Sequence, residues 1–252
     1  MISIKTPEEI RIMTKGGRIL AGIIKELEKQ VKPGITTKEL DKLAENLILK
    51  SGAKCSFKGY EGFPDCLCVS VNEQIVHGVP SNQVLKEGDI ISLDLGLRYE
   101  GYHSDMATTV PVGKVKPEIL RLIRVTKKAL KMGIKKTKSG NTLGDIGRVI
   151  QNYVESQGFN VVRELCGHGI GKELHEDPKI LNYSKPYSSL SGFKIKEGMV
   201  FCIEPMVTMG DWRIKKGKDG HVYQTIDGSL SAHFEAQVAV VQNGNKILTP
   251  IP

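Results

Sequence analysis

The sequence contains no long hydrophobic run and few aromatic side chains, 6% of its 252 residues. No apolar stretch approaches the ~18 residues that a membrane-spanning helix needs. The N-terminal segment MISIKTPEEI becomes charged at once, unlike a secretory signal. We therefore expect a cytoplasmic protein with no membrane partner. The chain is 40% hydrophobic and 25% charged, which is ordinary for one globular protein of this length.

Paired cysteine motifs are also missing. The five cysteines form no C-x-x-C pair and no even-numbered framework, and most have apolar neighbours, as buried free thiols do. Reduced thiols are typical of cytoplasmic proteins. The sequence therefore predicts a reduced chain with free thiols at Cys55, Cys66, Cys68, Cys166 and Cys202.

Acidic residues are fewer than basic ones, 28 against 36, which gives a net charge of +8. This excess favours an anionic neighbour, for example the ribosome surface. The lysines are scattered, however, and the densest segment (125–138) lacks the interleaved aromatic residues that stack on bases. A solvated helix face is the simpler interpretation of that segment, and ribosome contact is an expectation from charge alone.

The chain contains an internal repeat. KPGITTKEL (32–40) aligns with KSGNTLGDI (138–146), and the Thr36–Glu39 and Thr142–Asp145 pairs both indicate a capped helix start. LKEGDIISLDLG (85–96) aligns with IKEGMVFCIEPM (195–206), so that Asp94 and Glu204 occupy equivalent strand positions. Two matches at offsets of 106 and 110 residues indicate two similar halves.

The pattern of helix and strand signals predicts an α+β fold. Capping and stop signals predict helices from Thr6 to about Val31 and near 37–50, 117–136 and 142–156, with Gly52 and Gly158 as C-caps. Alternating segments predict strands near 66–71, 89–95, 102–111, 199–206 and 233–241, and Asn243-Gly244 predicts a hairpin turn. We expect an antiparallel sheet flanked by two helix pairs.

Two aspartates converge in the segment ISLDLGLRYEGYHSDMATTV (91–110), which predicts a hairpin. A tip at Tyr99-Glu100 places Asp94 opposite Asp105, and a tip at Glu100-Gly101 pairs Asp94 with Ala107. Either register leaves both aspartates on one face. Buried carboxylates this close repel each other unless a cation or a proton intervenes.

Two further acids and a histidine extend this pattern. Glu204 and Glu235 lie in apolar strand segments, and CGHGIGKELHEDP (166–178) holds His168 and His175. Four carboxylates and one imidazole match two divalent cations, with the imidazole admitting transition metals. Two such ions can activate a water molecule in hydrolytic enzymes. The sequence therefore predicts a two-metal hydrolytic site.

The chain as a whole resembles the type I, bacterial methionine aminopeptidases. The resemblance rests on five residues in family order (Asp94, Asp105, His168, Glu204 and Glu235) and on the motifs NEQIVHGVP (72–80), GHGIG (167–171), EPM (204–206) and SLSAHFE (229–235). It implies the pita-bread fold, whose pseudo-twofold symmetry agrees with the repeat. It also implies one catalytic domain over residues 1–252, with halves at about 1–112 and 113–252.

The resemblance implies a ligand set and a reaction. One divalent ion is held by Asp105, His168, Glu204 and Glu235, and a second by Asp94, with Asp105 and Glu235 shared. Cobalt, manganese, iron and zinc all suit this set. The two metals activate a water molecule, which attacks the first peptide bond of nascent polypeptides and releases methionine when the second residue is small and uncharged. Family members are usually monomers.

The same resemblance assigns roles to neighbouring residues. His175 hydrogen-bonds the scissile carbonyl and its oxyanion, His77 contacts the substrate near the scissile nitrogen, and Glu204 handles the proton of the attacking water. Tyr60, Phe63 and Cys68 match positions that line the methionine pocket. Leu174 stands where an aromatic residue is common, and His221 where tryptophan is common. A monovalent cation site is a further expectation, at positions matched by Asn72, Gln74 and Ser231.

Two alternative functions share these features. A basic binding protein built on an enzyme fold needs neither Asp94 nor Glu235 and shows steep salt dependence. A prolidase-like dipeptidase uses the same metals but differs in substrate length and requires proline. Proline-specific relatives usually carry a large N-terminal domain, and type II enzymes insert a helical subdomain late in the catalytic domain. The 36 residues from His168 to Glu204 and the 31 from there to Glu235 leave no room for that insertion.

Overall fold

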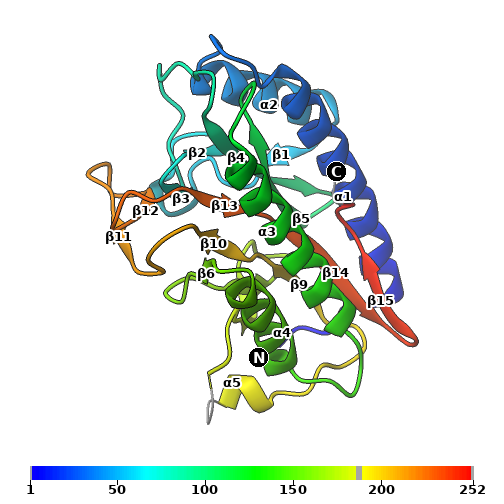
Figure 1. Cartoon of the computed structure of the whole chain (residues 1–252). Helices are drawn as coiled ribbons and strands as arrows, with labels where there is room; N and C mark the ends of the chain where they lie inside the picture. The colour runs from blue at the N-terminus through cyan, green and yellow to red at the C-terminus, as the bar shows by residue number, and fades with distance from the viewer. Residues whose placement is uncertain (1, 186–188, 251–252) are drawn as a thin grey trace.

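The computed structural model describes residues 2–185 and 189–250. Its four long helices agree with the predicted segments to within a residue at each end, whereas the two short ones were not predicted (Figure 1). They are α1 (Pro7–Gln30), α2 (Thr37–Lys50), α3 (Pro117–Lys136), α4 (Leu143–Ser156), the short α5 (Ser189–Gly192) and a 3₁₀ turn (Tyr60–Gly62).

The predicted capping pairs start the helices. Thr36 accepts a hydrogen bond from the backbone N–H of Glu39, whose side chain accepts one from the N–H of Thr36, and the same reciprocal pair forms between Thr142 and Asp145. Each box satisfies two N–H groups that a helix start leaves unpaired. Beyond the ends of these helices, Gly52 and Gly158 both have φ of 77°, as C-cap glycines do. The helix signals in the sequence are therefore confirmed.

The strands pair antiparallel throughout the described part of the chain, in four hydrogen-bonded sheets rather than one. They are β1 (Lys54–Cys55), β2 (Leu67–Val71), β3 (Gln74–Val76), β4 (Ile90–Tyr99), β5 (Tyr102–Pro111), β6 (Asn160–Val161), β7 (Gly167–Gly169), β8 (Glu176–Ile180), β9 (Val200–Ile203), β10 (Met206–Thr208), β11 (Ile214–Lys216), β12 (Tyr223–Thr225), β13 (Ser231–His233), β14 (Ala236–Val241) and β15 (Gly244–Ile247).

The internal repeat is visible in the backbone contacts. An isolated antiparallel bridge joins Thr36 to Val84, and its counterpart joins Thr142 to Lys194. Beside these bridges, the N–H of Leu85 donates to Ile35 and the N–H of Ile195 donates to Asn141, both over 2.9 Å. Equivalent residues of the two repeats thus make equivalent contacts, which confirms the pseudo-twofold relation.

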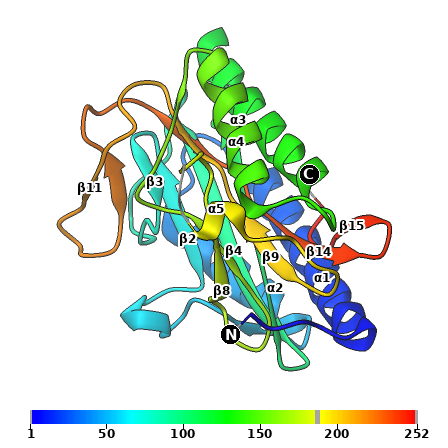
Figure 2. The ribbon, with the colours of Figure 1, turned by 90° about the horizontal axis from the view of Figure 1, so that it is seen from below.

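The helix pairs cover the strands from one side (Figures 1 and 2). α1 packs on β4 and β5 and α2 on β2, whereas α3 and α4 pack on strands of the second half, including β9, β10 and β6. Each pair encloses its own apolar cluster, with Leu20 and Leu40 in one and Leu122 and Ile150 in the other, all fully buried. A smaller third cluster, which contains Phe57 and Cys68, adjoins the cavity described below.

Two predicted strands are interrupted at acids. The segment 199–206 divides into β9 and β10 around Glu204-Pro205, and the segment 233–241 divides into β13 and β14 around Phe234-Glu235. Proline cannot donate to a ladder, and it keeps the preceding residue extended. The final hairpin turns one residue earlier than predicted, because Val241 pairs with Gly244.

The prediction of five free thiols is wrong for two of them. Cys55 and Cys66 form a disulfide, whereas Cys68, Cys166 and Cys202 are free. The two bonded cysteines are 11 positions apart in the sequence, and the strand pairing described below brings them together.

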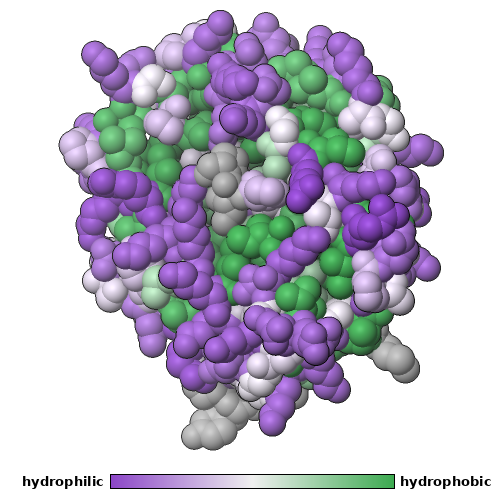
Figure 3. All heavy atoms as spheres, turned by 90° about the vertical axis from the view of Figure 1, so that its right-hand side faces the viewer, coloured by the Kyte–Doolittle hydropathy of each residue, from purple (hydrophilic) through white to green (hydrophobic). Residues whose placement is uncertain are grey.

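The outer surface is polar on the side of α1 and β15. Figure 3 shows hydrophilic side chains spread over this face, with hydrophobic ones in smaller areas between them. None of the helices in the described ranges is long and apolar enough to cross a membrane.

Candidate metal centre

The predicted site residues gather around one cavity of about 800 Å³. All of them line it: Tyr60, Phe63, Cys68, His77, Asp94, Asp105, His168, Leu174, His175, Glu204, His221 and Glu235. They come from both halves of the chain, so the fold brings together residues that the sequence keeps as much as 175 positions apart.

The two aspartates come from the β4–β5 hairpin. Its tip is Glu100-Gly101, both with positive φ, and Asp94 therefore pairs with Ala107. This is the second of the two predicted registers. Asp105 lies diagonally across the ladder from Asp94 on the same face, and both side chains are buried.

The two glutamates lie at the strand interruptions. The N–H of Glu235 donates to the carbonyl of Ala107 over 2.9 Å, which fixes the break between β13 and β14 against β5. The carbonyl of Glu204 accepts from Asn182 over 2.9 Å. Each acid is thus placed by a backbone bond to another segment rather than by a regular strand, and both carboxylates point into the cavity that Asp94 lines.

His168 supplies a nitrogen in a defined tautomer. Its Nδ1–H donates to the carbonyl of Gly169 over 2.9 Å, and a carbonyl can only accept. Nε2 is therefore unprotonated, 3.6 Å from Glu204 Oε1 and 4.0 Å from Glu235 Oε1. Burial, followed by the nearby His175, lowers the pKa of His168 to about 3. A neutral imidazole with a fixed tautomer is suited to bind a metal ion.

The acids are held under strong mutual repulsion. Burial raises the pKa of Asp94 to about 7. Burial and then the neighbouring acids raise the pKa of Asp105, Glu204 and Glu235 well above the usual range. Charge in this cluster therefore requires a positive partner.

The cluster fits a divalent metal. One oxygen each of Asp94, Asp105 and Glu235 is buried without a hydrogen-bond partner, and ligand atoms of these three residues lie within 4.8 Å of one another. Carboxylate oxygens are the ligands of hard divalent cations, and the adjoining imidazole of His168 admits transition metals. The unpaired oxygens are those that a cation would satisfy.

Two other histidines lie beside the cluster. The His175 ring contacts His168 edge-to-face at 4.3 Å and the Tyr60 ring at 5.1 Å, and burial lowers its pKa. His77 is an exposed residue at the mouth of the cavity. Desolvation by the cavity walls, followed by the nearby His175 and His221, lowers its pKa to about 4. Both rings can therefore act as neutral hydrogen-bonding groups at neutral pH.

The remaining predicted residues form the cavity wall. Phe63 contacts His221 edge-to-face at 5.6 Å, so His221 lies at the rim rather than among the acids. Leu174 and Cys68 are largely buried and line the cavity. The expected cation-site positions also adjoin one another: Ser231 donates from its N–H to the carbonyl of Asn72 and from its hydroxyl to that of Gln74.

Several cavity residues escape sequence reasoning. They include Phe57, Glu61, Cys166, Lys216 and Tyr223. Tyr223 contacts His77 at 5.8 Å from the β11–β12 hairpin, a segment without a recognisable motif. Cys202 is a second omission, since its sulfur lies within 4.8 Å of ligand atoms of His168 and Glu235. Cys202 precedes Glu204 by two residues, and residues at this spacing in an extended segment point to the same side. This spacing could have predicted that Cys202 lies beside the acids.

Comparison with known proteins gives one consistent family. Residues 11–242 match the model of metallopeptidase family M24. Methionine aminopeptidase 1 of Bacillus subtilis is 49% identical over 251 residues, which is 100% of both chains. The crystal structure of methionine aminopeptidase from Thermotoga maritima is 45% identical, with a TM-score of 0.96 over 100% of both chains. Xaa-Pro dipeptidase from Bacillus anthracis is 25% identical with a TM-score of 0.80, and this chain covers only 62% of it.

Proposed function

The chain belongs to metallopeptidase family M24 and is a metal-dependent aminopeptidase, and we propose that it releases N-terminal methionine from nascent proteins whose second residue is small and uncharged. The observation that carries this proposal is the shared cavity, in which three buried acids, the largely buried Glu204 and His168 adjoin an apolar wall and two neutral histidines. The full-length likeness to two methionine aminopeptidases supports the choice of substrate.

We assign two divalent ions to the buried cluster. Asp105, His168, Glu204 and Glu235 would hold the first ion, and Asp94, with Asp105 and Glu235 shared, would hold the second. The mutual approach of the Asp94, Asp105 and Glu235 ligand atoms supports the shared arrangement. Cobalt, manganese, iron and zinc all suit these ligands. A monovalent cation beside Asn72, Gln74 and Ser231 completes the proposed cofactors.

The residues around the ions divide the work of hydrolysis. Bound divalent ions supply Lewis acidity and lower the pKa of water. Glu204, whose pKa is raised, accepts the proton of the attacking water at its carboxylate and later gives it up again. His175 donates a hydrogen bond to the oxygen of the scissile carbonyl as negative charge develops there, and His77 binds near the scissile nitrogen.

Substrate selection follows from the cavity wall. Phe63, Cys68 and Leu174 give an apolar, sulfur-containing surface that suits the flexible side chain of methionine. Tyr60 and His221 close its rim. With Leu174 and His221 in place of larger aromatic side chains, this part of the cavity is wider and more polar than a fully aromatic one.

We further propose a single catalytic domain over residues 1–252, with halves at about 1–112 and 113–252, that acts as a monomer in the cytoplasm. Nascent N-termini are its substrates, and the net charge of +8 favours contact with the anionic ribosome surface. In a reducing compartment the Cys55–Cys66 disulfide is reversible rather than permanent.

The test measures methionine release from Met-Gly-Met-Met and Met-Leu-Met-Met after chelation and after return of each divalent metal. We expect release from the first peptide only, lost with chelator and regained with metal. Cleavage of both peptides would contradict the rule on the second residue. Hydrolysis of Leu-Pro without methionine release would instead identify a prolidase-like enzyme, and no activity with any metal would overturn the proposal.

A further inference from the structure

A loop beside the cavity leaves one edge of β4 and returns to it. β5 occupies the whole of the other edge, so β1 and β2 share the remaining edge end to end. Cys55 in β1 lies opposite Leu97, and Leu67 in β2 lies opposite Leu95. Residues 57–65, here called the pocket loop, therefore bulge out from the sheet between two strands that lie end to end along the same edge of β4.

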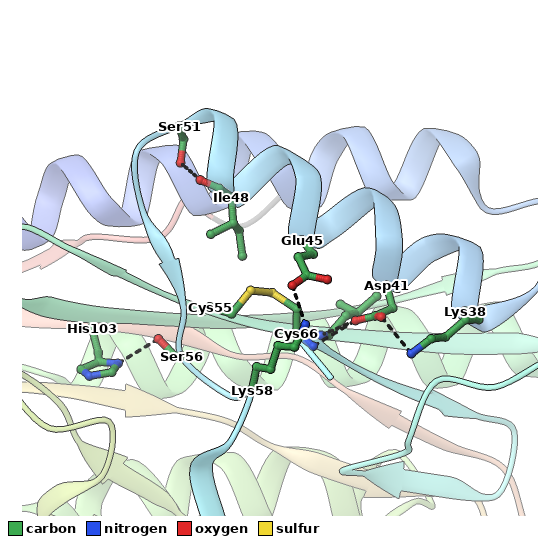
Figure 4. Close-up of a disulfide and its surroundings, with 11 residues drawn as sticks. Lys38, Asp41, Glu45, Ile48, Ser51, Cys55, Ser56, Lys58, Cys66 and His103 are labelled. Atoms are coloured by element: carbon green, nitrogen blue, oxygen red, sulfur yellow. Dashed lines mark hydrogen bonds and ion pairs between the residues drawn. A yellow bond between two sulfur atoms is a disulfide. The ribbon is translucent and has the colours of Figure 1, made fainter. Parts of the chain in front are cut away.

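The disulfide closes the base of the pocket loop. Cys55 and Cys66 have Cα atoms 5.4 Å apart, under α2 (Figure 4). Gly96 lies in β4 between the partners of Cys55 and Leu67, and a Cβ added to it would stand 2.7 Å from the ring of Phe57. The base of the loop is thus both covalently closed and tightly packed against β4.

The other attachments of the pocket loop are weaker. Lys58 pairs with Glu45 over 2.6 Å and is half exposed (Figure 4), so solvent screens the interaction. Asp65 pairs with Lys38, which is also partly exposed. Within the loop, the N–H of Gly59 donates to the carbonyl of Phe63 over 2.8 Å. The two ends of the loop are held on β4 by strand pairing and by the Ser56 N–H, which donates to the carbonyl of Gly96 over 3.0 Å, and the disulfide adds a covalent link between them.

The pocket loop reaches the catalytic histidine through Tyr60. The Tyr60 hydroxyl lies 3.0 Å from Nδ1 of His175, and the two rings meet nearly at right angles, at 84°. If the hydroxyl donates to Nδ1, the proton of the neutral imidazole resides on Nε2. Nε2 then serves as the donor that the proposed role of His175 requires.

We propose that Tyr60 is a positioning residue that fixes the tautomer and orientation of His175, and that the Cys55–Cys66 disulfide preserves this contact by closing the pocket loop. The functional part of this inference rests on the proposed aminopeptidase activity. The covalent bond makes the contact sensitive to redox state, and attack is expected at Cys55, because this residue is partly exposed whereas Cys66 is buried.

The redox step uses a dithiol as the reductant. One thiolate attacks the Cys55 sulfur and breaks the S–S bond, and the second thiolate resolves the mixed disulfide. Two electrons and two protons pass to Cys55 and Cys66, which become thiols, while the dithiol becomes a disulfide. The base of the pocket loop then loses its covalent closure and is held by strand pairing alone, which weakens the restraint on Tyr60.

The first experiment replaces Tyr60→Phe, which keeps the ring and removes only the hydroxyl. We expect kcat for Met-Gly-Met-Met to fall about 10-fold or more, the usual cost of losing a partner that orients a functional histidine, with KM nearly unchanged. Tyr153→Phe makes the same chemical change on α4, away from the cavity, and should leave both constants unaltered. A Tyr60→Phe variant that changes KM alone would make Tyr60 a wall residue and overturn the proposal.

The second experiment is a double-mutant cycle. Cys55→Ser with Cys66→Ser should lower kcat several-fold in the wild-type background and have little further effect in Tyr60→Phe, because both changes act through the same contact. Lys58→Met removes the Lys58–Glu45 ion pair shown in Figure 4 and should leave kcat unchanged. Additive losses would overturn the link between disulfide and Tyr60. Alkylation of both cysteines in the oxidised native protein would overturn the disulfide itself.

A third measurement does not depend on activity. The ring ¹⁵N shifts of His175 at pH 8 should report Nε2 protonation in the wild type and a mixture of tautomers in Tyr60→Phe. Identical shifts in the two proteins would refute the positioning role. If the wild type released no methionine with any metal, the proposed function would fail, whereas these shifts would still decide whether Tyr60 sets the tautomer.

Discussion

At the scale of single residues, the centre depends on acids placed where acids are unfavourable. Burying a carboxylate without a partner is costly, and four lie together here beside neutral imidazoles. The amino-acid sequence alone reveals this conflict, since Asp94 stands between two leucines and Glu235 lies in the largely apolar segment HFEAQVAVV (233–241). A cation resolves it, and each carboxylate can be tested separately.

Glu235→Gln keeps the shape of the side chain and removes its charge. Because Glu235 is assigned to both ions, we expect metal affinity in calorimetric titration to fall by more than about 10-fold, the least that even an indirect partner of a ligand contributes. The kcat should fall with it. Glu155→Gln, at an exposed helix end, is the matched control. Unchanged affinity and stoichiometry in Glu235→Gln would contradict the assignment.

Asp227 offers a pH test outside the metal centre. Its carboxylate accepts bonds from the N–H of Asp211 over 2.7 Å and from the N–H and hydroxyl of Ser229, which lower its pKa from 3.8 to about 2. A depressed pKa stabilises the fold above pH 3.8, and this contribution is lost as the pH falls towards 2. The Asp227→Asn variant should therefore have a lower Tm than the wild type at pH 7, and the difference between the two Tm values should become smaller at pH 3. A constant difference in Tm would count against this linkage.

At the scale of elements, two glycines in α1 have opposite roles. A Cβ on Gly17 would stand 2.2 Å from the carbonyl oxygen of Leu248, whereas a Cβ on exposed Gly22 would meet nothing within 4 Å. Gly22→Ala should raise the free energy of unfolding by up to about 1 kcal/mol through helix propensity. Gly17→Ala should lower it by about 1–3 kcal/mol, because a backbone atom must move. Urea unfolding measures both, and equal effects would refute the packing argument.

The contrast between these glycines shows what could be predicted from the sequence. Local signals sufficed for the helices, because the capping boxes at Thr36 and Thr142 act within four residues. They also left only two registers for the Asp94–Asp105 hairpin. They could not separate Gly17 from Gly22, since the neighbour at Leu248 is distant in sequence.

The same limit applied to the strand breaks and the cysteines. The interruption at Glu235 depends on a backbone bond to Ala107, more than a hundred residues earlier. The Cys55–Cys66 pair depends on two short segments meeting at one edge of β4. The resemblance to a known family predicted many residues of the cavity. It could not predict these two tertiary contacts, because neither belongs to a motif of that family.

At the scale of the whole molecule, the centre joins the two halves. Asp94 and Asp105 come from the first repeat, and His168, Glu204 and Glu235 come from the second, while each half has a separate apolar cluster beneath its own helix pair. Ions bound as proposed would therefore contribute directly to the contact between the halves, in addition to their proposed catalytic role.

Metal binding should consequently stabilise the whole fold. A ligand that binds only the folded chain at 100 times its Kd adds about 2.7 kcal/mol, which for a chain of this size raises Tm by roughly 5–10 °C. We expect calorimetry to give a Tm lower by this amount for the chelated protein. Each divalent metal that is added back should raise the Tm again, and the metals that bind more tightly should raise it more. Glu235→Gln should show a smaller rise at the same metal concentration, because it binds more weakly. If chelated and metal-loaded wild type unfolded at the same temperature, the buried acids would not be held together by cations, and their proton occupancy would have to explain the stability of the centre instead.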